Sequence, residues 1–147
     1  MIKFTTGNIF ETKADILVNT VNCVGVMGKG IALAFKNTYP EMFEEYKQVC
    51  HIGLRPGTLH VWKRKEPKAW VINFPTKDDW RNNSRYEYIE EGLKSLKAYL
   101  SDIGKLTIAV PPLGCGYGGL DWAKVKEMII KHLDGLEAEI VVLEPTK

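Results

Sequence analysis

Two glycine-rich segments, each set between an apolar run and a helix-like run, constrain this chain more than any other feature. The first is CVGVMGKG at residues 23–30, after the apolar run at 16–18, and the second is GCGYGG at 114–119, after the run at 107–112. Glycine lets a backbone turn sharply and approach a ligand closely, because it has no Cβ. Free N–H groups at the start of a helix bind anions, above all phosphates. The pair of segments therefore predicts a ligand with two phosphates that is held from both sides.

Neither segment has the spacing of a standard nucleotide-binding motif. The first spaces its glycines as G-x-x-G-x-G, whereas the dinucleotide fingerprint is G-x-G-x-x-G. Gly30 also follows Gly28 and Lys29 at the position where a P-loop needs Ser or Thr for magnesium. The alternative that both segments are only tight turns stays open at this point.

Length and composition indicate one globular domain. With 147 residues, 45% hydrophobic and 26% charged, such a chain buries roughly 68–70% of its unfolded surface. No apolar run reaches the ~18 residues that span a membrane, and the N-terminus lacks a signal-peptide core. Three cysteines without C-x-x-C spacing predict neither a disulfide framework nor a zinc site. We therefore expect a cytoplasmic protein without membrane contact, metal or cofactor. The net charge of +2 confines any nucleic-acid contact to a local surface.

Strand-like and helix-like periodicities alternate along the chain. Short apolar runs predict strands at residues 2–5, 15–21, 58–62, 70–74, 105–111 and 138–143. Helices are predicted after the first glycine-rich segment, from Pro40 to near Gly53, from a capping box at Ser84 and Glu87 to residue 103, and after an Asp121 cap. Residues 63–68 are predicted as a solvated hairpin turn. The alternation predicts a three-layer α/β/α fold with its ligand outside the carboxyl ends of the strands, where both glycine-rich segments and residues 73–80 fall.

At these residues the sequence resembles the macrodomain family. The matching motifs are TGNI at 6–9, NTVN at 19–22, GKGIA at 28–32 and PLGCG at 112–116, in the family's order and spacing over essentially the whole chain. Residues 19–30 together with NFPTK at 73–77 are similar to the DarG group of macrodomains, the antitoxins of DarT–DarG pairs. The resemblance implies a single α/β macrodomain over residues 1–147, with three α/β/α layers and a mixed, mostly parallel central sheet. It also implies binding of ADP-ribose and its removal from thymidine bases of DNA, which reverses the modification made by a DarT-type toxin.

The resemblance places ADP-ribose along these motifs. Asn8 lies where many macrodomains have an Asp that faces the adenine amino group, and an amide oxygen accepts the same bond without charge assistance. Ile9 would bring apolar surface to the adenine ring. Asn22 corresponds to the polar residue beside the distal ribose and is expected to take part in catalysis. Two groups of residues correspond to the loops around the diphosphate and the distal ribose: Gly28, Lys29, Gly30, Ile31 and Ala32 in the first, and Gly114, Cys115, Gly116, Tyr117, Gly118, Gly119 and Leu120 in the second.

Lys77 corresponds to the lysine on which the DarG group depends for hydrolysis. The related terminal ADP-ribose protein glycohydrolases pair that lysine with an aspartate in the second loop, where this chain has Gly118. Their covalent lysyl route therefore does not simply transfer, although it stays open. A lysine in an ordinary environment is protonated at pH 7, so we expect the Lys77 ammonium to stabilise negative charge as the base departs. The alternatives are that Lys77 is a solvated surface charge and that Asp121 is catalytic rather than a helix cap.

The residues next to Lys77 suit contact with ADP-ribosylated single-stranded DNA. Trp80, Arg81 and Arg85 combine an aromatic ring with two cations, which favours base stacking and phosphate contact. A polar loop that leads into a capped helix explains the same run equally well, so both interpretations stay open.

Other residues of the loops carry weaker chemistry, and other functions remain as alternatives. Cys23 and Cys115 have no histidine in the same loops, so they are expected to pack rather than act as nucleophiles. Asp78 and Asp79 offer either a general base or a solvated pair. The alternative functions are a non-enzymatic ADP-ribose reader and a hydrolase of ADP-ribosylated protein side chains or small ADP-ribose derivatives. DarG proteins carry a further C-terminal domain that contacts the toxin, so the sequence leaves open whether this chain is a fragment with a DarT-type toxin as partner.

Overall fold

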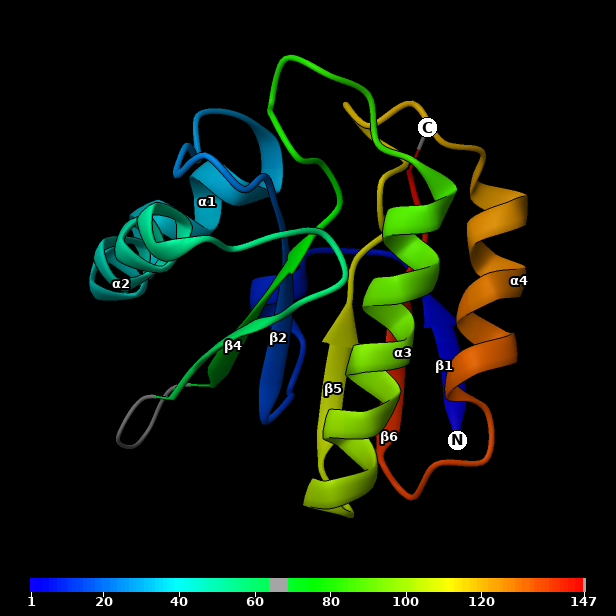
Figure 1. The fold of residues 1–147 in the computed structure, drawn as a ribbon. Helices are drawn as coiled ribbons and strands as arrows, with labels where there is room; N and C mark the ends of the chain where they lie inside the picture. The colour runs from blue at the N-terminus through cyan, green and yellow to red at the C-terminus, as the bar shows by residue number, and fades with distance from the viewer. Residues whose placement is uncertain (64–68, 147) are drawn as a thin grey trace.

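The computed structural model describes residues 1–63 and 69–146, which form a six-stranded sheet with helices on both faces (Figure 1). The strands are β1 (Ile2–Thr5), β2 (Ile16–Val21), β3 (His60–Trp62), β4 (Trp70–Pro75), β5 (Thr107–Val110) and β6 (Glu139–Leu143). The helices are the short 3-10 helix η1 (Ile9–Glu11), α1 (Gly30–Thr38), α2 (Pro40–Ile52), α3 (Tyr86–Ile103) and α4 (Trp122–Leu133). The strand order is β1-β6-β5-β2-β4-β3, and every described pairing is parallel except that of β3 with β4. The predicted α/β fold with a mixed, mostly parallel sheet is confirmed.

Strand β2 lies inside the sheet, and its place between β4 and β5 determines where the site forms. Its apolar run is buried because both faces of a parallel strand are covered by other layers. It pairs in parallel with β4 on one side and with β5 on the other. The carboxyl ends of the three strands therefore meet at one edge of the sheet, and the segments that follow them lie close together. The predicted hairpin turn at residues 63–68 lies, from residue 64 on, outside the described residues.

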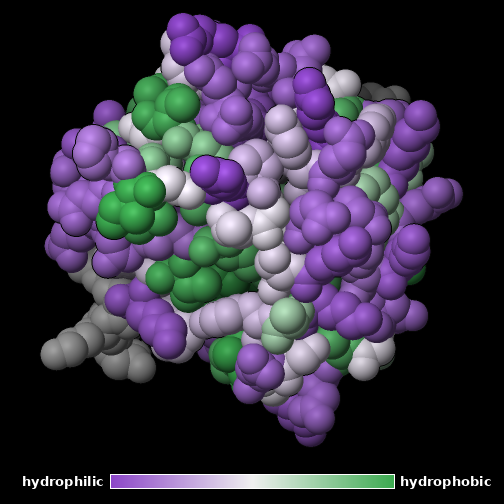
Figure 2. All heavy atoms as spheres, viewed as in Figure 1, coloured by the Kyte–Doolittle hydropathy of each residue, from purple (hydrophilic) through white to green (hydrophobic). Residues whose placement is uncertain are grey.

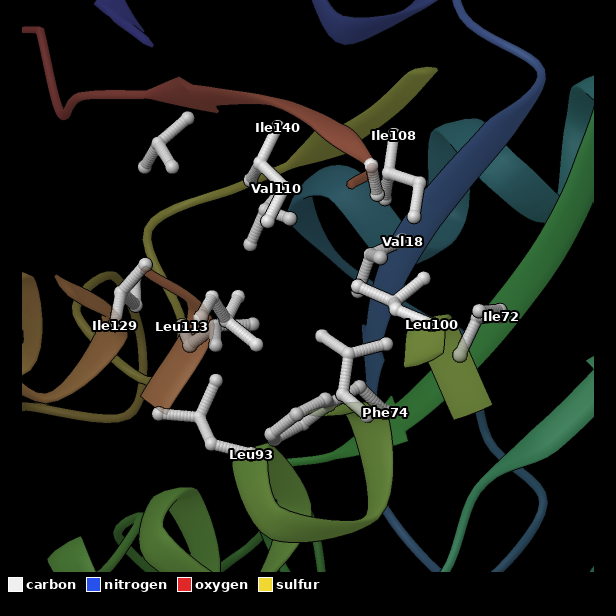
Figure 3. Packing of buried hydrophobic residues seen from close by; sticks show 14 of the residues in the cluster. Val18, Ile72, Phe74, Leu93, Leu100, Ile108, Val110, Leu113, Ile129 and Ile140 are labelled. Carbon is white, nitrogen blue, oxygen red and sulfur yellow. The ribbon is translucent and has the colours of Figure 1, made fainter. Parts of the chain in front are cut away.

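Two apolar cores fix the three layers. Helices α3 and α4 cover one face of the sheet, where Leu93 of α3, Ile129 of α4 and Phe74 of β4 belong to one buried cluster (Figure 3). Helices α1 and α2 cover the other face, where Phe35 and Tyr46 are fully buried (Figure 1). Burying a large apolar side chain stabilises a fold by roughly 1.5–3 kcal/mol, so each helix is held mainly by its buried face. Within the described ranges, no helix combines the length and the apolar character needed to cross a membrane.

The start of α3 differs from the prediction, whereas α4 begins after Asp121 as predicted. Arg85 is the N-cap of α3 and makes no side-chain capping bond, so the predicted capping box at Ser84 and Glu87 is wrong. Ser84 is buried instead, and its backbone N–H donates to the carbonyl oxygen of Gly118 over 3.0 Å. Asp121 is the N-cap of α4, although its side chain makes no capping hydrogen bond. Packing against the second glycine-rich loop therefore draws Ser84 away from the helix end.

The contact between α3 and β4 leaves no room for a methyl group at Gly92. A Cβ on Gly92 would overlap the ring of Phe74, which is fully buried. Gly92→Ala should therefore lower the free energy of unfolding by about 1–2 kcal/mol, because the deep overlap with the ring costs ~2–3 kcal/mol and alanine regains ~1 kcal/mol over glycine in a helix. Urea unfolding measures this change. The double variant Phe74→Leu/Gly92→Ala should be more stable than the sum of the two single losses predicts. The control Lys97→Ala, at an exposed position of α3, should cost less than ~0.5 kcal/mol. Wild-type stability of Gly92→Ala would contradict the packing.

Candidate functional site

A cavity of about 850 Å³ lies at the carboxyl ends of β2, β4 and β5. Small-molecule sites usually measure ~300–1,000 Å³, so this cavity has the size for a nucleotide-like ligand. Its lining residues are Thr20, Val21, Asn22, Val26, Gly28, Lys29, Gly30, Ile31, Ala32, Thr76, Lys77, Trp80, Arg81, Asn82, Asn83, Pro111, Pro112, Gly114, Gly116, Tyr117 and Gly118. Both glycine-rich loops and the loop after β4 therefore share one site.

Most of the residues expected at the site line this cavity. Six of the expected residues do not: Asn8, Ile9, Cys115, Gly119, Leu120 and Arg85. Thr20, Thr76 and the two prolines that follow β5 also line the cavity although no ligand contact was predicted for them, and so do Asn82 and Asn83 of the polar run 80–85 beside Lys77. Their position in the sequence could have identified these residues, because each lies at or beyond the carboxyl end of a strand that is followed by a predicted site residue.

The first glycine-rich loop leads into the start of α1. Lys29 is the N-cap of α1 and makes no side-chain capping bond, and no acidic residue lies in the first turn. The first N–H groups of a helix have no partner within the helix, and the positive end of its dipole favours an anion. Gly30, Ile31 and Ala32 of this turn line the cavity, so the geometry suits a phosphate at this end.

Asn22 holds the first loop in shape. Its Oδ1 accepts hydrogen bonds from the N–H groups of Val24 (3.1 Å) and Val26 (3.3 Å) and lies 2.8 Å from the hydroxyl of Tyr46, while its Nδ2 donates to the Val26 carbonyl over 2.7 Å. Tyr46 is fully buried in α2, so the loop is anchored to the helical layer. The side chain lies at the cavity, but its oxygen is already engaged; the catalytic role assigned to Asn22 stays a prediction.

Removing the Asn22 side chain should loosen the first loop measurably. Asn22→Ala should speed the exchange of the Val24 and Val26 amide hydrogens by about 10-fold, since each loses an acceptor worth ~0.5–1.5 kcal/mol. Native-state hydrogen exchange read by mass spectrometry measures this. Asn37→Ala, at an exposed position of α1, is the matched control and should leave the loop unchanged. Equal protection of residues 24–26 in Asn22→Ala and wild type would contradict the anchoring.

Lys77 lines the cavity from the loop after β4, next to the end of β2. Its Nζ donates to the carbonyl oxygen of Trp80 over 3.4 Å, and the loop is tied to the first glycine-rich loop by a 2.9 Å bond from the Cys23 N–H to the Asp78 carbonyl. In the part of the chain that the structure describes, no acidic side chain forms an ion pair with Lys77. Its ammonium is therefore available to a ligand.

Arg81 and Asp79 neutralise each other beside Lys77. The guanidinium donates from Nε to Oδ1 over 3.0 Å and from Nη2 to Oδ2 over 2.6 Å. Hydrogen bonding from Arg81 lowers the pKa of Asp79 to about 2. A carboxylate with so low a pKa is a weak general base at neutral pH, which argues against Asp79 as the group that activates water.

The second glycine-rich loop is packed tightly at Gly118. A Cβ at this position would overlap both the Ser84 hydroxyl and the Gly114 carbonyl oxygen. An aspartate at position 118, as in the related lysine–aspartate enzymes, therefore has no room in this loop. The Ser84 hydroxyl itself is buried and has no hydrogen-bond partner among the residues described.

We assign no chemical role in the cavity to the remaining residues predicted for the site. Burial raises the pKa of Cys23 to about 12 and that of Cys115 to about 11, so both are thiols at neutral pH, as expected of packing residues. The Asn8 side chain accepts a 2.9 Å bond from the Phe10 N–H and caps η1, and Ile9 is buried; their contact with adenine stays a prediction. Within residues 1–63 and 69–146, no cluster of metal-ligating side chains occurs.

The fold and the site define a class: a three-layer α/β domain with a cavity between two glycine-rich loops at the carboxyl ends of its central strands. The Macro domain family model matches residues 18–129. The chain belongs to the macro domain family.

The chain is similar to known proteins over its whole length. A Thermus aquaticus protein named DNA ADP-ribosyl glycohydrolase is 45% identical over 152 residues, which cover 100% of this chain and 42% of that protein. The structure of the macrodomain of Thermus aquaticus DarG is 44% identical, with a TM-score of 0.93 and 99% coverage of both chains. The structure of Thermosipho africanus DarTG in complex with ADP-ribose is 30% identical, with a TM-score of 0.88 over 99% of this chain and 42% of that one. The chain thus spans 42–43% of the length of the curated DNA ADP-ribosyl glycohydrolases that it matches.

Proposed function

We propose that this domain binds ADP-ribose and hydrolyses its bond to thymidine bases of DNA. The observation that carries the proposal is the single cavity that brings both glycine-rich loops together with Lys77. The Thermus aquaticus relative is named a DNA ADP-ribosyl glycohydrolase, and the Thermosipho africanus structure is in complex with ADP-ribose. Both names support the same ligand and reaction for this chain.

In the proposed complex the diphosphate lies between the two glycine-rich loops. The unpaired N–H groups at the start of α1 face it from one side, and the backbone of Gly114, Gly116 and Gly118 approaches from the other. The distal ribose then points toward the end of β2 and Lys77. Placing adenine near Asn8 and Ile9 rests on the family resemblance alone.

The proposed reaction is a simple displacement by water. Water attacks the anomeric carbon of the distal ribose, the bond from that carbon to the base nitrogen breaks, and its electron pair leaves with the base. The water loses a proton and the departing base gains one. The Lys77 ammonium donates to the base carbonyl or to ribose oxygens and stabilises the developing negative charge. Because Gly118 leaves no room for a carboxylate, this role is favoured over the covalent lysyl route.

The main alternatives use the same cavity differently. A reader would bind ADP-ribose without hydrolysis, and a protein-directed hydrolase would accept a glutamate-linked substrate. Trp80 and Arg81, which line the cavity beside Lys77, favour a DNA substrate because rings and cations bind single strands. A DarT-type toxin partner and a cytoplasmic location are proposed from the resemblance to antitoxins.

Two substrates offered separately test the proposal. One is a single-stranded oligonucleotide that carries ADP-ribose on thymidine, and the other is a protein that carries it on glutamate, each with a metal chelator present. We expect free ADP-ribose from the oligonucleotide. Release from the protein alone would overturn the proposal in favour of a protein-directed hydrolase. Binding of ADP-ribose with no release from either substrate would support the reader.

A further inference from the structure

Two aromatic side chains stand out at the rim of the cavity. Among the described residues, the exposed aromatic side chains are Trp80, at 50% relative exposure, and Tyr117, at 69%, and both line the cavity. On the face shown in Figure 2, hydrophilic side chains predominate and apolar ones form separate groups. Exposed apolar surface beside a binding site often marks where a partner binds. We therefore expect these two rings to contact a planar, apolar group of a ligand.

Each ring has a cation beside it. The Lys29 ammonium lies 5.7 Å from the centroid of the Tyr117 ring, and the Arg81 guanidinium lies 5.6 Å from that of Trp80. A ring with a neighbouring cation matches one nucleotide, because the base stacks on the ring and its phosphate meets the charge. The charge beside Trp80 is largely compensated by Asp79, so stacking is the stronger part of that contact.

The topology places the two rings on loops that follow the strands on either side of β2. Trp80 follows β4 and Tyr117 follows β5, and β2 lies between these two strands in the sheet. The Tyr117 ring also leans across to the first loop, where a Cβ on Gly30 would lie 3.1 Å from its Cε2. Both rings therefore border the same cavity as Lys77, from loops that follow different strands.

We propose that Trp80 and Tyr117 stack on the bases that flank the modified thymidine. This inference rests on the proposed function and deepens it: the substrate is a short single-stranded stretch, read through its neighbouring bases without regard to their sequence. Every base has a flat π face, so stacking is tolerant of sequence. A duplex would keep these bases paired and away from the rings.

The test compares an oligonucleotide with a nucleoside. For each variant, kcat/KM is measured on ADP-ribosylated thymidine within a single-stranded oligonucleotide and on the ADP-ribosylated nucleoside alone. Trp80→Ala and Tyr117→Ala should each lower the oligonucleotide-to-nucleoside ratio by about 5-fold to 150-fold, the range for one stacked base. Trp80→Phe and Tyr117→Phe keep a ring and should restore most of the ratio. Ile130→Ala, at an exposed apolar position of α4 outside the cavity, should leave it unchanged.

A second substrate separates stacking from phosphate contact. An oligonucleotide with abasic positions on both sides of the modified thymidine keeps the phosphates and removes the flanking bases. The ratio of wild type should then fall at least as far as it does in either alanine variant. An unchanged ratio with the abasic strand, or an equal loss on oligonucleotide and nucleoside in both alanine variants, would overturn the inference. Failure of wild type to hydrolyse either substrate would instead overturn the proposed function.

Discussion

Lys77→Ala should lower the rate of DNA de-ADP-ribosylation by at least ~100-fold, the scale of losing one electrostatic stabiliser, while ADP-ribose affinity stays within a few-fold of wild type. The change leaves untouched the two glycine-rich loops, which we propose hold the diphosphate. An interaction made mainly in the transition state lowers kcat and spares binding. Single-turnover rates on modified DNA and calorimetry with ADP-ribose measure the two quantities. Lys97→Ala, on the exposed side of α3, controls for loss of a positive charge.

Lys77→Arg separates the two mechanisms. Arginine keeps the positive charge but changes the donor geometry, so partial activity would support the ammonium role. An inactive arginine variant, together with a lysyl adduct that borohydride traps in wild type, would support the covalent route instead. Full activity in Lys77→Ala would refute the catalytic assignment.

Gly118→Ala should weaken ADP-ribose binding by roughly 10-fold to 100-fold, because overpacking costs ~1–3 kcal/mol and the second loop must move to relieve it. The added methyl group would overlap the Ser84 hydroxyl and the Gly114 carbonyl oxygen. Ligand binding to the native state raises the thermal midpoint, so the shift caused by ADP-ribose reports the loss. The midpoint without ligand shows whether the fold itself survives.

Gly116 supplies the matched control. It lines the same cavity, its φ is not in the left-handed region, and a Cβ there would meet nothing within 4 Å. Gly116→Ala should therefore bind ADP-ribose nearly as well as wild type does. Equal affinities of Gly118→Ala and wild type would show that the tight packing of this loop does not shape the site.

The sheet edge that carries the site could be predicted because its signals are local. Apolar runs place β2, β4 and β5 in a parallel sheet, and the glycine-rich segments and Lys77 follow the carboxyl ends of these strands in the sequence. Once the strands pair, the predicted loops converge whatever their detailed shape. Pro40 likewise opens α2 as predicted, because its fixed φ suits the first turn of a helix.

The contacts that shape the loops could not be predicted, because they join distant parts of the chain. Asn22 meets Tyr46, which lies 24 positions further on. Ser84 had the spacing of a helix cap, but its packing against Gly118 decides its place. At both positions, contacts between distant parts of the chain decide the structure rather than local propensity. No spacing rule in the sequence predicts either pair.

The polar side chains inside the sheet show the same limit. Asn19 interrupts the apolar run of β2 and is fully buried, where a polar side chain normally needs hydrogen-bond partners. The parallel register places Asn19 beside Asn73 of β4, and the Asn19 Nδ2 donates to the Asn73 Oδ1 over 3.1 Å, whereas the Asn19 Oδ1 has no partner among the described residues. Asn73 in turn lies 2.9 Å from His60 Nδ1 of β3. Such a chain of partners depends on which strands are neighbours, and only the structure supplies that.

Mass spectrometry of one modified strand tests the central claim most directly. A single-stranded oligonucleotide with ADP-ribose on one thymidine is incubated with this domain alone, in the presence of a chelator. We expect the modified strand to be replaced by the intact unmodified strand and an equal amount of free ADP-ribose, and Lys77→Ala to leave the modified strand in place. A modified strand that persists beside a domain able to bind ADP-ribose, or a product strand that has lost its thymine, would contradict the proposed hydrolysis.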